Sequence, residues 1–138
     1  MRITASVVNT VRTHSVRVAT DGAEQSLAIP AREGRPGSSA NGGEMLCAAL
    51  ATCYCNDLYR EAHSQGIALT RVEVEVDAIF GGRGEAAKSI SYRARVEGDA
   101  SADVLAQLMA DTDRVAEIQN TVRGGCEVRF AGHIDRDP

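Results

Sequence analysis

Tryptophan is absent from this chain, and aromatic residues make up only 4% of its 138 residues. The sequence therefore offers few surfaces on which bases or sugars could stack. It also lacks an apolar run near the ~20 residues that span a bilayer, and its N-terminus lacks the apolar core of a signal peptide. We expect a cytoplasmic protein with no membrane partner.

An excess of positive charge is missing as well. The net charge is -4, and acidic and basic residues are interspersed along the chain. No basic stripe is present that could displace counterions from a nucleic-acid backbone, so nucleic acid is not an expected partner. The 43% hydrophobic and 25% charged residues are typical of an ordinary globular protein. The length fits one domain, residues 1–138.

Four cysteines are present, at positions 47, 53, 55 and 126. Structural disulfides rarely persist in the reducing compartment expected here. Three of the cysteines fall on one predicted helix, where Cys53 and Cys55 point roughly 200° apart and cannot converge with Cys47 on one ion. We therefore expect no metal site and no cofactor. A disulfide between Cys53 and Cys55 is also disfavoured.

The N-terminal third predicts short antiparallel strands. Apolar residues alternate along residues 3–7, 16–18 and 27–29, and Asp21-Gly22 marks a turn. Residues 30–43, PAREGRPGSSANGG, predict an irregular loop. The Ala- and Leu-rich residues 44–65 predict one long helix, with Gly66 as its C-terminal cap.

The remaining elements predict an α+β fold. Residues 70–79 and 89–97 alternate as two strands with opposed acidic and basic faces. A second helical region, residues 101–123, is expected to break near Asp111-Thr112-Asp113, and a last strand begins at Cys126. This order predicts helices gathered on one side of antiparallel sheets. Residues 45–51 carry no charge, which favours burial of the long helix between two subunits.

Free cysteines beside alanine and leucine commonly fill space in a core, and that role is the expected one for Cys47 and Cys126, with Cys55 leaning the same way. The segment around Cys53 differs. Residues 41–62, NGGEMLCAALATCYCNDLYREA, resemble the hallmark of the OsmC/Ohr superfamily, the osmotically inducible and organic hydroperoxide resistance proteins. In that hallmark an Asn-Pro-Glu-x-Leu entry leads into a helix with an Ala-Ala-Cys-Phe core. Cys53 takes the position of the reactive cysteine.

This resemblance covers nearly the whole chain and implies an OsmC-like fold that assembles as an intertwined homodimer. It also implies that Cys53 reduces organic hydroperoxides, held as thiolate by an arginine that pairs with Glu44. A nearby guanidinium lowers a thiol pKa by favouring the charged form. Arg35 is the first choice for this arginine, with Arg32 and Arg12 as alternatives. Each of these arginines could instead be a solvated surface residue.

The chain departs from the family where a second cysteine usually condenses with the oxidised first one. Ala116 replaces that cysteine and Glu117 the following proline. Recycling would need an external thiol reductant, Cys55 or Cys126. Carboxylates at Asp113 and Glu117 would also oppose thiolate formation.

Two functions therefore remain open. One is a peroxidase-like enzyme that uses Cys53 on hydroperoxides. The other is a non-catalytic dimer that binds a small molecule in the same interfacial pocket, where the polar residues 56–61, NDLYRE, would help to form the pocket. Those polar residues are more simply explained as ion pairs on the helix surface.

Overall fold

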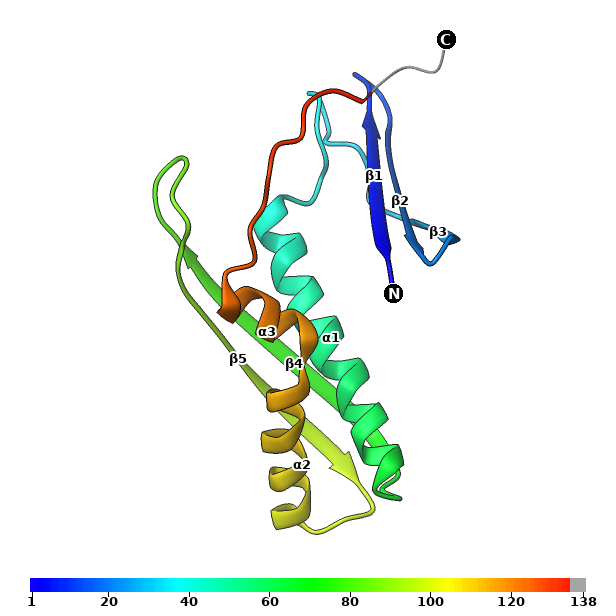
Figure 1. Ribbon diagram of the computed structural model, residues 1–138, viewed down its shortest axis with the longest axis vertical. Coiled ribbons are helices and arrows are strands. Elements are labelled where there is room, and N and C mark those ends of the chain that lie inside the picture. Colours follow the sequence, from blue (N-terminus) through cyan, green and yellow to red (C-terminus); the bar gives the residue numbers. More distant parts are fainter. Residues whose placement is uncertain (135–138) are drawn as a thin grey trace. The chain divides into compact units, whose positions relative to one another are not determined.

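The computed structural model describes residues 1–134 and divides into two units, Met1–Cys47 and a second that begins at Ala48. Its elements follow the predicted order up to the second helical region, as Figure 1 shows. The α+β class with antiparallel strands is confirmed. The single domain expected over residues 1–138 stays a prediction, and its last four residues lie outside the described part.

The first unit holds a three-stranded antiparallel sheet. It consists of β1 (Ile3–Asn9), β2 (His14–Thr20) and β3 (Ala23–Leu27), paired in that order. Asp21 and Gly22 join β2 to β3 with φ values of 48° and 88°. Positive φ at both central residues is the signature of the two-residue turn that matches the twist of a hairpin. The first two predicted strands and the turn are confirmed, whereas β3 lies earlier than the predicted residues 27–29 and ends at Leu27.

A reciprocal cap starts the long helix α1 (Gly42–Ser64). The Glu44 backbone N–H donates to the Asn41 side chain at 2.9 Å, and the Asn41 N–H donates to the Glu44 carboxylate at 2.7 Å. This capping box satisfies two N–H groups that a helix terminus otherwise leaves unpaired. At the other end Gly66 adopts the left-handed φ of 70°. The predicted helix and its glycine cap are confirmed.

The second unit contains a long hairpin of β4 (Leu69–Phe80) and β5 (Ala87–Gly98). Glu75 lies opposite Arg93 and Glu73 lies opposite Arg95. The Glu75 carboxylate accepts from Arg93 at 2.7 Å. The expectation that acidic and basic faces oppose one another across this pair is therefore confirmed.

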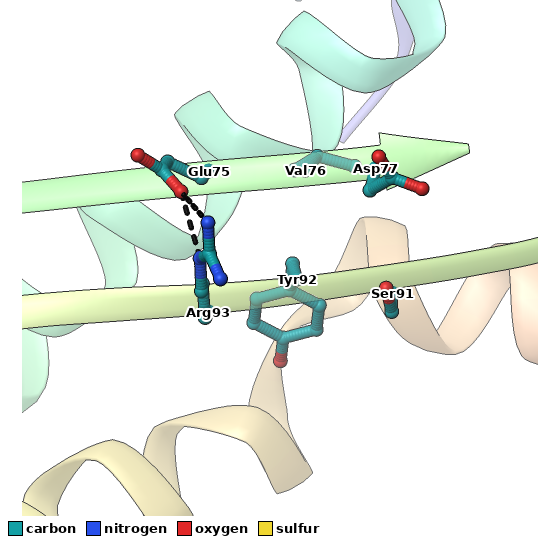
Figure 2. Close-up of a pocket in the computed structure, with 6 residues that line it drawn as sticks. All are labelled: Glu75, Val76, Asp77, Ser91, Tyr92 and Arg93. Carbon is teal, nitrogen blue, oxygen red and sulfur yellow. Dashed lines mark hydrogen bonds and ion pairs between the residues drawn. The ribbon is translucent and has the colours of Figure 1, made fainter.

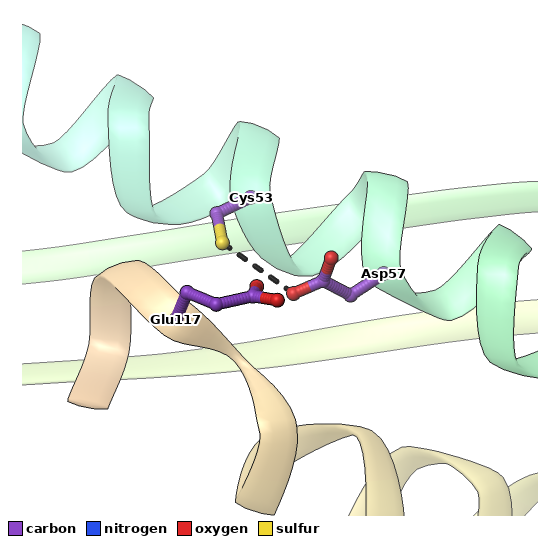
Figure 3. A group of neighbouring side chains, drawn as sticks. All are labelled: Cys53, Asp57 and Glu117. Atoms are coloured by element: carbon purple, nitrogen blue, oxygen red, sulfur yellow. Dashed lines mark hydrogen bonds between the residues drawn. The ribbon is translucent and has the colours of Figure 1, made fainter. Parts of the chain in front are cut away.

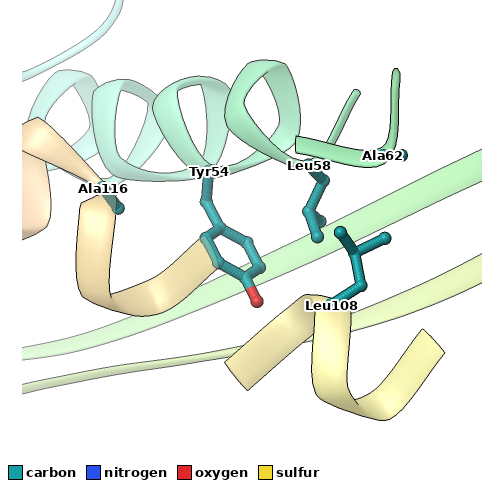
Figure 4. Packing of buried hydrophobic residues seen from close by; sticks show 5 residues of the cluster. All are labelled: Tyr54, Leu58, Ala62, Leu108 and Ala116. Atoms are coloured by element: carbon teal, nitrogen blue, oxygen red, sulfur yellow. The ribbon is translucent and has the colours of Figure 1, made fainter. Parts of the chain in front are cut away.

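A small core joins the helices of the second unit to one face of this hairpin (Figure 4). Leu58 from α1 and Leu108 from α2 (Ala102–Val115) are fully enclosed beside Tyr54. Alternate residues of the strands pack against this cluster: Val72, Val74, Tyr92, Ala94 and Val96. The helices thus lie on one side of the β4–β5 hairpin, as the sequence predicts.

The second helical region is broken at a different place from the one predicted. α2 continues through Asp111, Thr112 and Asp113, and α3 (Glu117–Gly124) begins after Ala116. Thr112 is fully buried and its hydroxyl donates to the Leu108 carbonyl at 2.7 Å, which lets it sit inside a helix. Ala116 instead has the extended ψ of 105°. Its small buried side chain lets the two helices meet there.

The last predicted strand is not formed within the described residues. Residues 126–134 are irregular, and the Val128 and Phe130 side chains are 97% and 89% exposed. Cys126 is exposed too. The prediction that Cys126 lies in the core is therefore wrong for a single copy of the chain. An alternating segment forms a strand only where another strand offers it a hydrogen-bonding edge.

Among residues 1–134, no helix has both the length and the apolar character that crossing a bilayer requires.

Candidate functional site

Cys53 lies on α1 in the second unit, with its side chain half-buried. Its thiol donates to the Asp57 carboxylate, with 3.4 Å between Sγ and Oδ2. The two residues are four positions apart and so share one helix face. Figure 3 shows both side chains pointing toward Glu117 at the start of α3.

Arg60 is the cation of this cluster. Its guanidinium contacts the second Asp57 oxygen at 2.9 Å and Glu117 at 3.4 Å. It also pairs with Glu61 at 2.9 Å. Asp57 is only 5% exposed, while Glu117 is 64% exposed at its side chain. One guanidinium is thus shared among three carboxylates, which leaves the surroundings of Cys53 negative.

The surroundings raise the pKa of the Cys53 thiol above its ordinary value. Burial is the largest cause, and the hydrogen bond and charge of Asp57 and the charge of Glu117 act in the same direction. The backbone N–H of Ile118, at the start of α3, acts in the opposite direction. The neutral thiol is therefore the favoured form in these surroundings.

The carboxylates contribute differently from what the sequence predicts. Glu117 does act on the thiol as expected. Asp113 does not contribute, because its carboxylate accepts from the Tyr92 hydroxyl and pairs with Arg123 at 2.6 Å. These contacts tie α2 to α3 and β5, and they hold the Asp113 pKa below its usual range, with the Tyr92 hydrogen bond as the main cause.

The pKa of Asp57 is raised as well. Burial is the largest cause, and the hydrogen bond from Cys53 and the charge of Arg60 partly oppose it, while Glu117 adds to it. Asp57 thus sits between a proton donor on one oxygen and a cation on the other. This arrangement orients its carboxylate toward the sulfur.

The same cluster is the described chain's one set of three neighbouring groups with metal-ligand chemistry. The ligand atoms of Cys53, Asp57 and Glu117 all lie within 4.8 Å of one another. Arg60 already supplies positive charge to both carboxylates. The expectation that no metal is bound stays a prediction.

Of the other predicted site residues, Glu44, Arg32 and Arg35 belong to the first unit. Glu44 is engaged in the capping box with Asn41. Arg32 Nε donates to the Ser38 carbonyl at 3.3 Å, within its own loop. A meeting of Cys53 with either arginine stays a prediction.

The family model described as OsmC-like protein matches residues 35–131, which include Cys53, Asp57 and Glu117. The chain belongs to the OsmC-like protein family. None of the curated proteins compared with it matches. The family resemblance noted around residues 41–62 is thereby confirmed.

Solved structures with the same fold come from several bacteria. An organic hydroperoxide resistance protein OsmC from Legionella pneumophila is 22% identical, with 90% of each chain covered and a TM-score of 0.60. An OsmC-like protein from Mycoplasma pneumoniae is 14% identical, with 88% of each chain covered and a TM-score of 0.61. An organic hydroperoxide resistance protein from Elizabethkingia anophelis is 17% identical, with 90% of this chain and 89% of that one covered and a TM-score of 0.53. At these identities the likeness establishes the fold.

All four cysteines of this OsmC-like chain are free. Cys47 and Cys55 are half-buried, so neither is the fully enclosed core residue that the sequence favours. Ala116 occupies the junction between α2 and α3 and is fully buried. Glu117, which follows it, faces the Cys53 cluster.

Asp57 and Arg60 belong to the site, although the sequence analysis interprets them as members of surface ion pairs. Arg60 does form those pairs, but Asp57 is buried and bonded to the thiol. Their signal was the spacing of four between Cys53 and Asp57, which places the two side chains on one helix face. The sequence could not show that α3 encloses that face.

A separate hollow of about 640 Å³ lies on the β4–β5 hairpin and contains none of these groups (Figure 2). Glu75 and Arg93 point toward one another across it and neutralise each other's charge. Asp77 also lines the hollow, and it takes no part in this ion pair.

Proposed function

We propose that this OsmC-like protein reduces organic hydroperoxides through Cys53 and is restored by an external thiol. The observation that carries the proposal is a partly exposed thiol on α1 that faces the first turn of α3, within the segment that the family model matches. The resemblance of residues 41–62 to the family hallmark assigns this thiol the reactive position. The sulfur attacks one peroxide oxygen, an S–O bond forms and the O–O bond breaks. Cys53 becomes a sulfenic acid and the hydroperoxide is reduced to an alcohol.

The recycling step follows from what stands beside Cys53. Ala116 offers no thiol at the α2–α3 junction, and Cys55 points to another side of α1. An external thiol would attack the sulfenic sulfur, release water and form a mixed disulfide, and a second thiol would reduce it. A reducing cytoplasm, the setting that we propose, supplies such thiols.

The thiolate needs a cation that the Cys53 cluster does not supply in full. Arg60 is shared with Asp57, Glu61 and Glu117. We propose that Arg35, or Arg32 in its place, completes the site with Glu44 as its ion-pair partner. A guanidinium beside the sulfur would lower the Cys53 pKa and make the attack effective at neutral pH.

The second candidate is a non-catalytic dimer that binds a small molecule beside Cys53. The negative surroundings of the thiol favour it, because they hold the sulfur in its less reactive neutral form. An experiment that counts turnovers separates the two functions.

We expect the wild-type protein to consume many equivalents of cumene hydroperoxide when dithiothreitol is present. Cys53→Ser should lose this activity, because no other thiol occupies the site. Cys126→Ser should retain it, because Cys126 is exposed and makes none of the contacts of the cluster. The measurement is peroxide loss per protein. Consumption no faster than with dithiothreitol alone would favour the binding role.

The Glu44→Gln variant tests the proposed ion pair between Glu44 and the arginine. Glutamine also serves in a capping box, so the stability of α1 should change little. Loss of the charge should free the arginine and slow turnover. Turnover equal to that of the wild type would restrict Glu44 to its cap and remove it from the proposed site.

A further inference from the structure

The contacts around Cys53 bring together the groups that a different reaction requires. That reaction needs neither a second cysteine nor a reductant. A cysteine nucleophile in acyl transfer requires a base within hydrogen-bond reach, a group that orients the base, and donors for the developing oxyanion. Asp57 accepts from the Cys53 thiol at 3.4 Å. Arg60 holds the other Asp57 oxygen at 2.9 Å.

The start of α3 supplies the donors. Its N-cap residue, Ala116, makes no side-chain cap bond, so the first-turn N–H groups are left without that partner. This turn faces Cys53, because the carboxylate of Glu117, its first residue, lies within 4.8 Å of the Cys53 sulfur. Backbone N–H groups at a helix N-terminus stabilise negative charge that develops beside them.

We propose that Cys53, Asp57 and the first-turn N–H groups of α3 form a hydrolytic site for small uncharged esters and thioesters, a second activity at the cysteine assigned above to peroxide. Arg60 is a positioning residue that acts through Asp57. The carboxylates of Asp57 and Glu117 disfavour an anionic acyl group. Water is the only co-substrate.

The steps balance without oxidation or reduction. The Cys53 sulfur attacks the carbonyl carbon, and its proton passes to Asp57 as the S–C bond forms. The C–O bond to the alcohol breaks, and the alcohol leaves with the proton from Asp57. Asp57 then takes a proton from water, the water oxygen attacks the thioester carbon, the C–S bond breaks and Cys53 regains the proton.

One substitution distinguishes this site from a thiol that is merely reactive. With 4-nitrophenyl acetate, the wild-type protein should release many equivalents of 4-nitrophenolate. Asp57→Asn should still be acetylated at Cys53, giving one equivalent, but its turnover should fall by about 100-fold or more because the base for water is lost. Asp57→Glu should recover part of the turnover. Cys53→Ser should show neither the first equivalent of 4-nitrophenolate nor the turnover that follows it.

Intact mass of the protein during the reaction identifies the acetyl adduct on Asp57→Asn and shows that its Cys53 remains reactive. Wild-type protein that stops after one equivalent would overturn the proposal, as would Asp57→Asn that turns over at the wild-type rate. Peroxide turnover on the same preparation is a separate result. A protein that turns over peroxide but not the ester would contradict the hydrolytic site alone. A protein that turns over the ester but not peroxide would contradict only the peroxide reaction.

Arg60 has its own readout in the pH profile. Burial raises the pKa of Asp57, and the Arg60 charge partly offsets that rise while Glu117 on α3 adds to it. Arg60→Met should therefore move the acidic limb of ester turnover to higher pH, and Arg60→Lys should move it back. An unshifted limb in Arg60→Met would exclude Arg60 from this role.

Discussion

Replacing Asp57 with asparagine is expected to make Cys53 more reactive toward alkylation and peroxide at neutral pH. Burial is the main reason that the Cys53 pKa is raised, but the hydrogen bond and charge of Asp57 add to it. Removing that charge should lower the Cys53 pKa, so a larger share of the protein carries a thiolate at pH 7. A unit charge about 4 Å away contributes about 1 kcal/mol even in bulk water, or about fivefold in thiolate population.

Iodoacetamide alkylation of Cys53, followed across pH by peptide mass spectrometry, measures this effect. Asp103→Asn, which removes an exposed carboxylate from the first turn of α2, is the matched control and should leave the rate unchanged. An Asp57→Asn rate equal to or below the wild-type rate would contradict the electrostatic account. The same variant should stall ester turnover, so its two effects have opposite signs.

The protein is expected to sediment as a dimer at micromolar concentration, with twice the monomer mass of 14.6 kDa. Within the first unit, Val16 is the one hydrophobic side chain that is buried among the described residues. Ile3 and Val7 on β1 are 62% and 59% exposed, although they share the apolar face of the sheet with Val16. A three-stranded sheet needs a covered apolar face to be stable, and a second copy would provide the cover.

Val7→Lys should shift the sedimentation of the protein toward the monomer, because it places a charge on this apolar face. Ser6→Lys is the control, since adjacent residues of a strand point to opposite faces. A folded wild-type monomer at micromolar concentration would contradict the dimer. So would a Val7→Lys protein that stays dimeric.

Local patterns predict most of the fold correctly. Alternation identifies four of the five strands and places β3 too late in the chain, and the Asn41 and Gly66 caps explain where α1 begins and ends. The break in the second helical region was misplaced because Thr112 satisfies its hydroxyl inside the helix, on the Leu108 carbonyl. That hydrogen bond depends on burial, which a sequence pattern does not show. The strand expected from Cys126 needs a partner edge that this chain does not give it within the described residues.

The site is predicted less completely than the fold. Family resemblance identifies Cys53, and the sequence also indicates that Glu117 would bring negative charge to it. The role of Asp57 depends on α3 covering one face of α1, which is tertiary packing. Arg60 pairs as its spacing predicts, but its sharing among three carboxylates is visible only when both helices are in place.

Site-resolved oxidation is the most direct test of the claim that Cys53 is a specialised thiol. The protein is exposed to cumene hydroperoxide, sulfenic acids are trapped, and the rates at Cys53 and Cys126 are compared within one molecule by mass spectrometry. Cys126 is exposed and serves as the internal standard for an ordinary thiol. We expect Cys53 to be oxidised at least tenfold faster, because the proposed arginine would lower the Cys53 pKa, and each unit of lowering gives about tenfold more thiolate. Equal rates, or faster oxidation of Cys126, would contradict it.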